Sequence, residues 1–164
     1  MPFAGAAAPL TTSIDHSSNF FTMRMCLPIV SLHHVDSVRL ANASEQWPDG
    51  FVKIGEFVHK IEVTSTHGGR RLGKEYRDIS EPKLDWDPVE NWVQRADAIP
   101  HYLEETIAAK SRKNYGSLCW LVVYLNMDEY GIRHRETARV IAEIKARYSA
   151  NFEAVSILWK GQLY

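Results

Sequence analysis

Residues 47–66 read WPDGFVKIGEFVHKIEVTST, and this stretch decides the fold of the chain. Phe51 to Ile54 and Phe57 to Ser65 are rich in β-branched and aromatic residues, and Gly55-Glu56 separates them. This pattern predicts a β-hairpin. Trp47-Pro48-Asp49-Gly50 predicts a turn just before it, because the residue before proline disfavours helix and Asp-Gly favours a turn.

The segments on either side of the hairpin show different patterns. Upstream, helical spacing predicts a helix over residues 31–45, on the evidence of Val35, Val38, Arg39 and Ala43. Residues 41–47 show no strand pattern, so no strand is expected directly before Pro48. Downstream, residues 67–86 are polar without a clear period and predict a long loop.

A helix start follows this loop. Asp87 is expected to cap the helix, Pro88 to take its first position and Glu90 to complete a capping box. Apolar residues then keep helical spacing as far as Ile107. Pro100 is expected to kink or restart the helix, because it lacks a backbone N–H.

The rest of the chain predicts two buried strands with a helix between them. Leu118 to Leu125 and Val155 to Trp159 are nearly unbroken apolar runs, which are typical of strands buried on both faces. Residues 134–148 predict the intervening helix, so the two strands are expected to be parallel through a crossover. The order predicts an α/β fold, with a small mixed sheet of a hairpin and two parallel strands flanked by helices.

Length and composition limit the domain organisation. A chain of 164 residues has room for one domain. Residues 1–30 keep neither a strand nor a helix period, so they predict a flexible N-terminal arm before a single domain over residues 31–164. Met23 and Met25 are alternative starts of translation, which leaves open whether residues 1–22 belong to the working protein.

Charge and composition exclude several functional classes. The chain carries 19 Lys and Arg against 20 Asp and Glu, which argues against coating of nucleic acid or of an anionic membrane. No stretch approaches the roughly 18 apolar residues of a membrane span, and a cytoplasmic location is expected. Cys26 and Cys119 form no Cys-x-x-Cys pair, so no cysteine zinc site is expected.

The residues best suited to chemistry lie on the hairpin. Alternate residues of a strand share a face, so Lys60, Glu62 and Thr64 should point the same way. Asp49 precedes the partner strand and can lie beside Glu62, although 12 residues separate them. Two carboxylates on adjacent strands can hold Mg²⁺, which activates water and neutralises charge on a phosphoryl group.

Pro48-Asp49, the spacer and Glu62-Val63-Thr64 together resemble the restriction-endonuclease-like nuclease superfamily. Its motif is Pro-Asp, a spacer, then Asp/Glu-x-Lys, on a core of a helix, a β-meander, a helix and a strand. The resemblance covers roughly residues 31–125 and extends to residue 164 through a further helix and strand. It implies that Asp49 and Glu62 are metal ligands, with the Val63 carbonyl as a third, and that DNA is the substrate.

Thr64 departs from this motif, since it stands where the family has its lysine. That lysine is held to orient or deprotonate the attacking water and to stabilise phosphate charge, and a threonine supplies no cation. Lys60 is one replacement, about 7 Å along the same strand face from Glu62 at roughly 3.3 Å per residue. Lys74, in the loop after the strand, is the other.

Basic residues after the hairpin form a second candidate site. Arg70, Arg71 and Lys74 lie in a glycine-containing segment where forked donors and backbone amides can bind phosphate, although an exposed loop kept soluble by its charges is an alternative. His67 is a candidate general base. Three cations end the long helix: Lys110, Arg112 and Lys113. Their positive charges suit the helix dipole, or they form a second edge that contacts phosphate.

Three functions remain open on this basis. The first is Mg²⁺-dependent hydrolysis of DNA phosphodiester bonds. The second is a catalytically inactive module of the same fold that binds nucleic acid or protein. The third is a small α/β interaction protein without a nucleic-acid role, which a separation of Asp49 from Glu62 onto opposite faces would favour.

Overall fold

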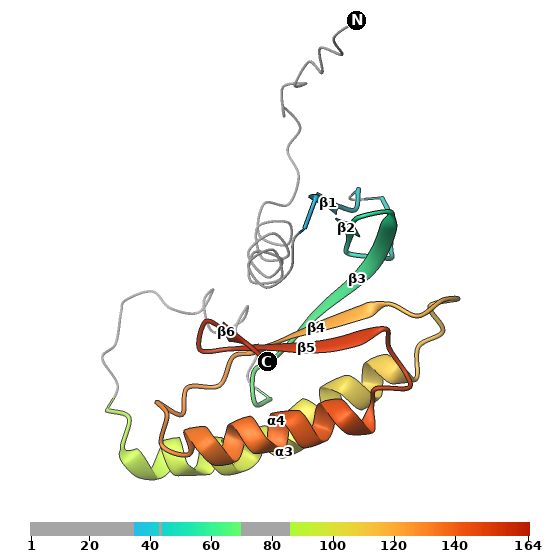
Figure 1. The fold of residues 1–164 in the computed structure, drawn as a ribbon. Coiled ribbons are helices and arrows are strands. Elements are labelled where there is room, and N and C mark those ends of the chain that lie inside the picture. The colour runs from blue at the N-terminus through green and yellow to red at the C-terminus, as the bar shows by residue number, and fades with distance from the viewer. Residues whose placement is uncertain (1–34, 43, 70–85) are drawn as a thin grey trace, which may run out of the picture.

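The computed structural model describes residues 35–42, 44–69 and 86–164. These residues form one six-stranded sheet with strand order β1-β2-β3-β4-β5-β6. Two helices of this part of the chain accompany the sheet, which confirms the predicted α/β class (Figure 1). The elements are β1 (Ser37–Leu40), β2 (Gly50–Ile54), β3 (Phe57–Thr66), α3 (Val89–Ser111), β4 (Trp120–Leu125), α4 (His134–Arg147), β5 (Ala154–Trp159) and β6 (Gln162–Leu163).

The sheet is mixed. Strands β1, β2 and β3 form an antiparallel meander, and the β2–β3 hairpin turns at Gly55-Glu56 as predicted. Strands β3, β4 and β5 are parallel neighbours, which confirms the crossover expected between the two apolar strands. The final strand β6 returns antiparallel to β5 through a tight turn at Lys160-Gly161, where both residues have positive φ.

The helix predicted over residues 31–45 is wrong where the structure describes it. Residues 37–40 are strand β1, and Val38 pairs with Val52 of β2. Residues 31–34 lie outside the described part of the chain. Because β1 can add backbone hydrogen bonds to the free edge of β2, tertiary pairing outweighs the local helical spacing. The meander therefore has a first strand, β1. It lies just before residues 41–47, which show no strand pattern in the sequence.

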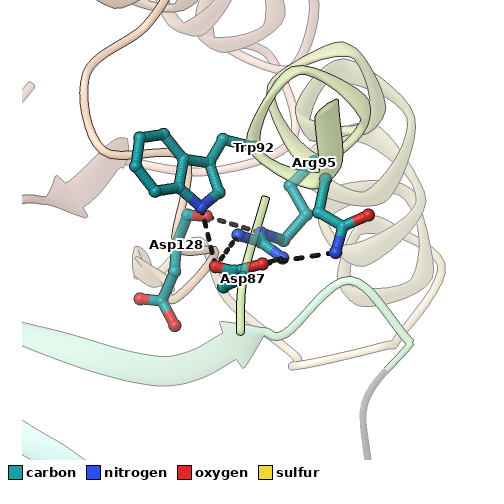
Figure 2. A network of polar contacts seen from close by, with 5 residues as sticks. Asp87, Trp92, Arg95 and Asp128 are labelled. Carbon is teal, nitrogen blue, oxygen red and sulfur yellow. Dashed lines mark hydrogen bonds and ion pairs between the residues drawn. The ribbon is translucent and has the colours of Figure 1, made fainter. Parts of the chain in front are cut away.

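The start of α3 also differs from the prediction. Pro88 is the N-cap rather than the first helical residue, and no side chain caps the helix. The Asp87 carboxylate instead accepts hydrogen bonds from the Trp92 indole at 2.8 Å and from Arg95 at 2.6 and 3.1 Å (Figure 2). Arg95 Nε also donates to the carbonyl of Asp128 at 2.5 Å, so this network ties the first turns of α3 to the segment after β4.

Helix α3 continues through Pro100, so of the two expected effects of this proline the restart does not occur. The residues on either side of the proline hold the helix to the sheet, since Ile99 and Leu103 are fully buried. Burial of apolar side chains favours the continuous helix and opposes the cost of the hydrogen bond that a proline removes. The helix therefore keeps one continuous buried face from Ala96 to Ile107.

The main core lies between the sheet and its helices. Helices α3 and α4 lie side by side along one face of the sheet, and β1 and β2 lie away from them (Figure 1). Ion pairs between Arg147 and Glu104, at 2.8 Å, and between Arg133 and Asp97 join the two helices. A second buried cluster lies on the opposite face of the sheet, formed by Val52, Ile61, Trp120, Val122 and Leu158.

Two predictions fall largely outside the described residues. The arm expected over residues 1–30 is not described, nor are residues 70–85 of the loop expected over 67–86. Within the part of the chain that is described, no helix has the length and apolar character needed to cross a membrane.

Candidate active site

Asp49 is anchored across the hairpin at the edge of β3. Its backbone N–H donates to the carbonyl of Ile61 at 3.0 Å, and its Oδ2 accepts from the backbone N–H of Val63 at 2.7 Å. These two contacts bracket Glu62 in the sequence. The hairpin register therefore brings the Pro-Asp half of the motif beside the Glu-x-Thr half, as the sequence predicts.

Glu62 carries a buried negative charge with two donors on one oxygen. Its side chain lies on the helix-covered face of the sheet, and the residue is 6% exposed. Lys110 Nζ lies 2.5 Å from Oε1, and the Tyr115 hydroxyl donates to the same oxygen at 3.2 Å. The last turn of α3 thus places a cation, Lys110, against the Glu62 carboxylate.

The crossover connection explains why Lys110 reaches this position. Strand β4 runs parallel to β3, and Leu121 pairs with Glu62. The connecting helix must therefore end at the end of the sheet where β4 begins, which brings its last turn close to Glu62. In the sequence, Lys110 suits either the helix dipole or a phosphate-contacting edge, and neither interpretation predicts Glu62 as its partner. The feature of the sequence that could have predicted this contact is a lysine in the last turn of a helix that connects two parallel strands.

The environment of Asp49 shifts the pKa of its carboxyl. Burial raises the pKa of Asp49 above its ordinary value, and the negative charge of Glu62 raises it further. The Val63 N–H and the positive charges of Lys110 and Lys113 oppose this rise in pKa. The charge of Glu62 therefore acts on the Asp49 carboxyl, which the hairpin holds between Ile61 and Val63.

Tyr115 is a permanent hydrogen-bond donor in this site. Burial raises the pKa of its hydroxyl, and the adjacent Glu62 charge raises it further. The phenol consequently stays protonated throughout the physiological pH range. Its ring stacks on Trp47, with centroids 5.4 Å apart and an interplanar angle of 29°.

Lys60 shares the face of Glu62 but has other partners. Its Nζ donates to Ser117 Oγ at 3.2 Å and lies 4.6 Å from the centre of the Trp47 ring. Thr64 is half-buried farther along the same strand. Lys60 and Lys74 are the two expected replacements for the family lysine. Lys60 lies at the edge of the site, and Lys74 lies outside the described residues.

The remaining predicted residues divide into two groups. Arg70 and Arg71 lie outside the described residues, so their phosphate-binding role stays a prediction. His67 lies beyond the end of β3, where its Nε2 is 2.7 Å from Ser65 Oγ and its Nδ1 is 3.3 Å from Asn126 Nδ2. These contacts lie at the carboxyl ends of β3 and β4, whereas Glu62 lies near the middle of β3.

The donor atoms suit Mg²⁺ better than zinc. No group of three or more His, Cys, Asp or Glu side chains that could hold a metal occurs among the described residues. Asp49 and Glu62 offer carboxylate oxygens, and the Val63 carbonyl faces the same strand edge as its N–H, which Asp49 binds. Mg²⁺ commonly uses one or two carboxylates and completes its shell with water and substrate phosphate.

Comparison of the chain with models of known protein families, with curated proteins and with solved structures gives no match. The residues of the site are therefore the basis on which a function can be assigned.

Proposed function

We propose that the protein is a divalent-metal-dependent hydrolase of phosphodiester bonds, with DNA as the expected substrate. The observation that supports this most is the contact between Lys110 and Glu62. It adds a cation to a coupled pair of carboxylates, and the motif lacks such a cation in the strand itself. The site then has each type of group that the resemblance to restriction-endonuclease-like nucleases implies.

Each residue has a role in this proposal. Asp49 and Glu62, with the Val63 carbonyl, are the ligands for Mg²⁺, which when bound supplies a Lewis acid and a water of lowered pKa. Lys110 stabilises negative charge that develops on the phosphate. Tyr115 orients Glu62 through its hydroxyl.

Phosphate binding farther from the reacting bond remains assigned to Arg70, Arg71 and Lys74, as the sequence predicts. Lys60 and Ser117, which contact each other at 3.2 Å, border the described side of the site. Because the net charge of the chain is −1, contacts with DNA are expected to be few and local.

A second candidate function is a catalytically inactive module that binds nucleic acid or protein. The burial of Glu62, which is 6% exposed, favours it, because a carboxylate already neutralised by Lys110 needs no metal. This module would bind its partner without hydrolysis.

Cleavage assays separate the two functions. The protein is incubated with plasmid and single-stranded DNA in Mg²⁺ or Mn²⁺, and EDTA reactions measure the metal-free background. Asp49→Asn, Glu62→Gln and Lys110→Met should each reduce cleavage at least about a hundredfold. Lys53→Met is the matched control, because Lys53 is an exposed lysine of β2 outside the site.

The possible results lead to different conclusions. Cleavage that survives both carboxylate substitutions comes from another source and removes the proposed activity. Salt-dependent DNA binding without cleavage, at equal affinity in the wild type and the Glu62→Gln protein, supports the inactive module.

A further inference from the structure

We infer that Lys110 and Tyr115 form a clamp on Glu62 which a divalent cation must displace, so that metal binding frees Lys110 to meet the substrate phosphate. This inference rests on the proposed function and concerns the regulation of the same site. It predicts that the two clamp residues weaken metal binding, even though Lys110 is needed for hydrolysis.

The contacts on Glu62 are the first support for the clamp. Lys110 Nζ and the Tyr115 hydroxyl both lie against Oε1, at 2.5 and 3.2 Å. The side chains of the ion pair are 18% exposed for Lys110 and 8% for Glu62, so little water screens the pair. A divalent cation that binds this oxygen has to replace the ammonium, because the two positive charges repel each other.

The segment between α3 and β4 supplies the second support. Residues 112–118 are exposed apart from Tyr115, which is half-buried. Tyr115 is held by its stack on Trp47, whose ring also lies 4.6 Å from Lys60 Nζ. The segment contacts the rest of the site through Tyr115 and through Ser117, which accepts from Lys60, so the Tyr115 hydroxyl can leave Glu62 without unfolding a helix or strand.

The freed lysine has a use in the proposed reaction. Lys110 sits in the last turn of α3, and its long side chain can swing without movement of the helix. Once a metal neutralises Glu62, the ammonium loses this partner and is free to pair with an anionic substrate that the metal also attracts. Metal binding and the placement of the cation are therefore coupled.

Titration with Mn²⁺ tests the clamp, with free Mn²⁺ counted by electron paramagnetic resonance and binding heat measured by calorimetry. Lys110→Met should bind Mn²⁺ at least about tenfold more tightly than the wild type, which corresponds to about 1.4 kcal/mol. Tyr115→Phe, which keeps the ring on Trp47, should also bind more tightly, by a smaller factor. Lys110→Met should at the same time lose hydrolysis.

Lys113→Met is the matched control for charge. Lys113 lowers the pKa of Asp49 through its positive charge, as Lys110 does, but it makes no described contact with Glu62. Its substitution should change the Mn²⁺ affinity less than the substitution of Lys110. Equal gains from Lys110→Met and Lys113→Met would show a general charge effect and overturn the clamp.

The remaining outcomes distinguish the clamp from the proposed function. Unchanged or weaker Mn²⁺ binding in both Lys110→Met and Tyr115→Phe overturns the clamp and leaves the metal site in place. Absence of binding that depends on Glu62, judged with Glu62→Gln, overturns both. If Lys110→Met does not fold, Tyr115→Phe decides alone, since tighter binding supports the clamp and unchanged or weaker binding overturns it.

Discussion

Lys110 and Glu62 are 48 positions apart in the sequence, and their side chains meet at 2.5 Å. The lysine ends helix α3 and the glutamate lies in strand β3. The local sequence around either residue does not predict its contact with the other. Glu62 belongs to the hairpin, and Lys110 belongs to the helix that connects β3 to β4. Their contact therefore joins two separate supersecondary units.

The pair should be strongly coupled in the metal-free protein. Lys110→Met leaves the buried Glu62 charge uncompensated and should lower the free energy of unfolding by about 3 kcal/mol at pH 7 in EDTA. Adding Glu62→Gln should recover most of this loss, because the buried charge is then absent. Urea unfolding of both single variants and the double variant measures the coupling.

Lys53→Met provides the control for this cycle, with a change within about 0.5 kcal/mol expected for an exposed position. A Lys110→Met protein as stable as the wild type would contradict a buried ion pair at this position.

Asp49 should reduce stability at neutral pH. Burial and the Glu62 charge raise its pKa in the folded protein above the unfolded value of 3.8. The stability linked to this group is therefore fully present below pH 3.8 and is lost as the pH rises through the folded-state pKa. Asp49→Asn, which can still accept from Val63, should raise the free energy of unfolding at pH 7 and have little effect near pH 3.5.

Urea unfolding of the wild type and the Asp49→Asn protein at several pH values checks this sign. A gap between the two proteins that widens as the pH falls would contradict it. Residues of functional sites often reduce the stability of the fold, so a destabilising charge at Asp49 agrees with a functional role.

Asp87 should have the opposite pH dependence. Hydrogen bonds from Arg95, and then from Trp92, lower the pKa of its carboxyl below 3.8 (Figure 2). Its contribution to stability is present above pH 3.8 and is lost as the pH falls through the lower folded-state pKa. Wild-type protein should therefore lose Trp92 and Arg95 contacts in acid, and Asp87→Asn should lack this transition.

Nuclear magnetic resonance of the Trp92 indole N–H follows this change directly. Asp87→Glu keeps the charge and serves as the comparison for geometry. An indole signal that shifts equally with pH in wild-type and Asp87→Asn proteins would rule out Asp87 as the titrating group.

Cys119 should be inert in the folded protein. The residue is 1% exposed, and burial raises the pKa of its thiol to about 11, with a further rise from the Glu62 charge. In a Cys26→Ser background, a thiol reagent at pH 8 should label Cys119 only after denaturant is added, because little thiolate forms and access is blocked. Rapid labelling of the native protein would show that the segment before β4 opens.

The sequence by itself determined most of the elements. Alternating and continuous apolar runs marked β2, β3, β4 and β5, and helical spacing marked α3 and α4, because burial on one or both faces leaves a local period. It also predicted that the Pro-Asp segment lies beside β3 near Glu62, and Asp49 does contact the backbone of Ile61 and Val63, since a short hairpin fixes which residues face each other. The antiparallel hairpin of β2 and β3 and the parallel relation of β4 and β5 followed from the short turn and from the helical crossover.

Only the tertiary structure decided the remaining features. Residues 37–40 are a strand because β2 offers a free edge, and Asp87 binds Trp92 and Arg95 in place of a capping role. Lys110 meets Glu62 because the helix α3 crosses back to the start of β4. These contacts depend on how distant segments pack, and local propensity carries no information about the register of that packing.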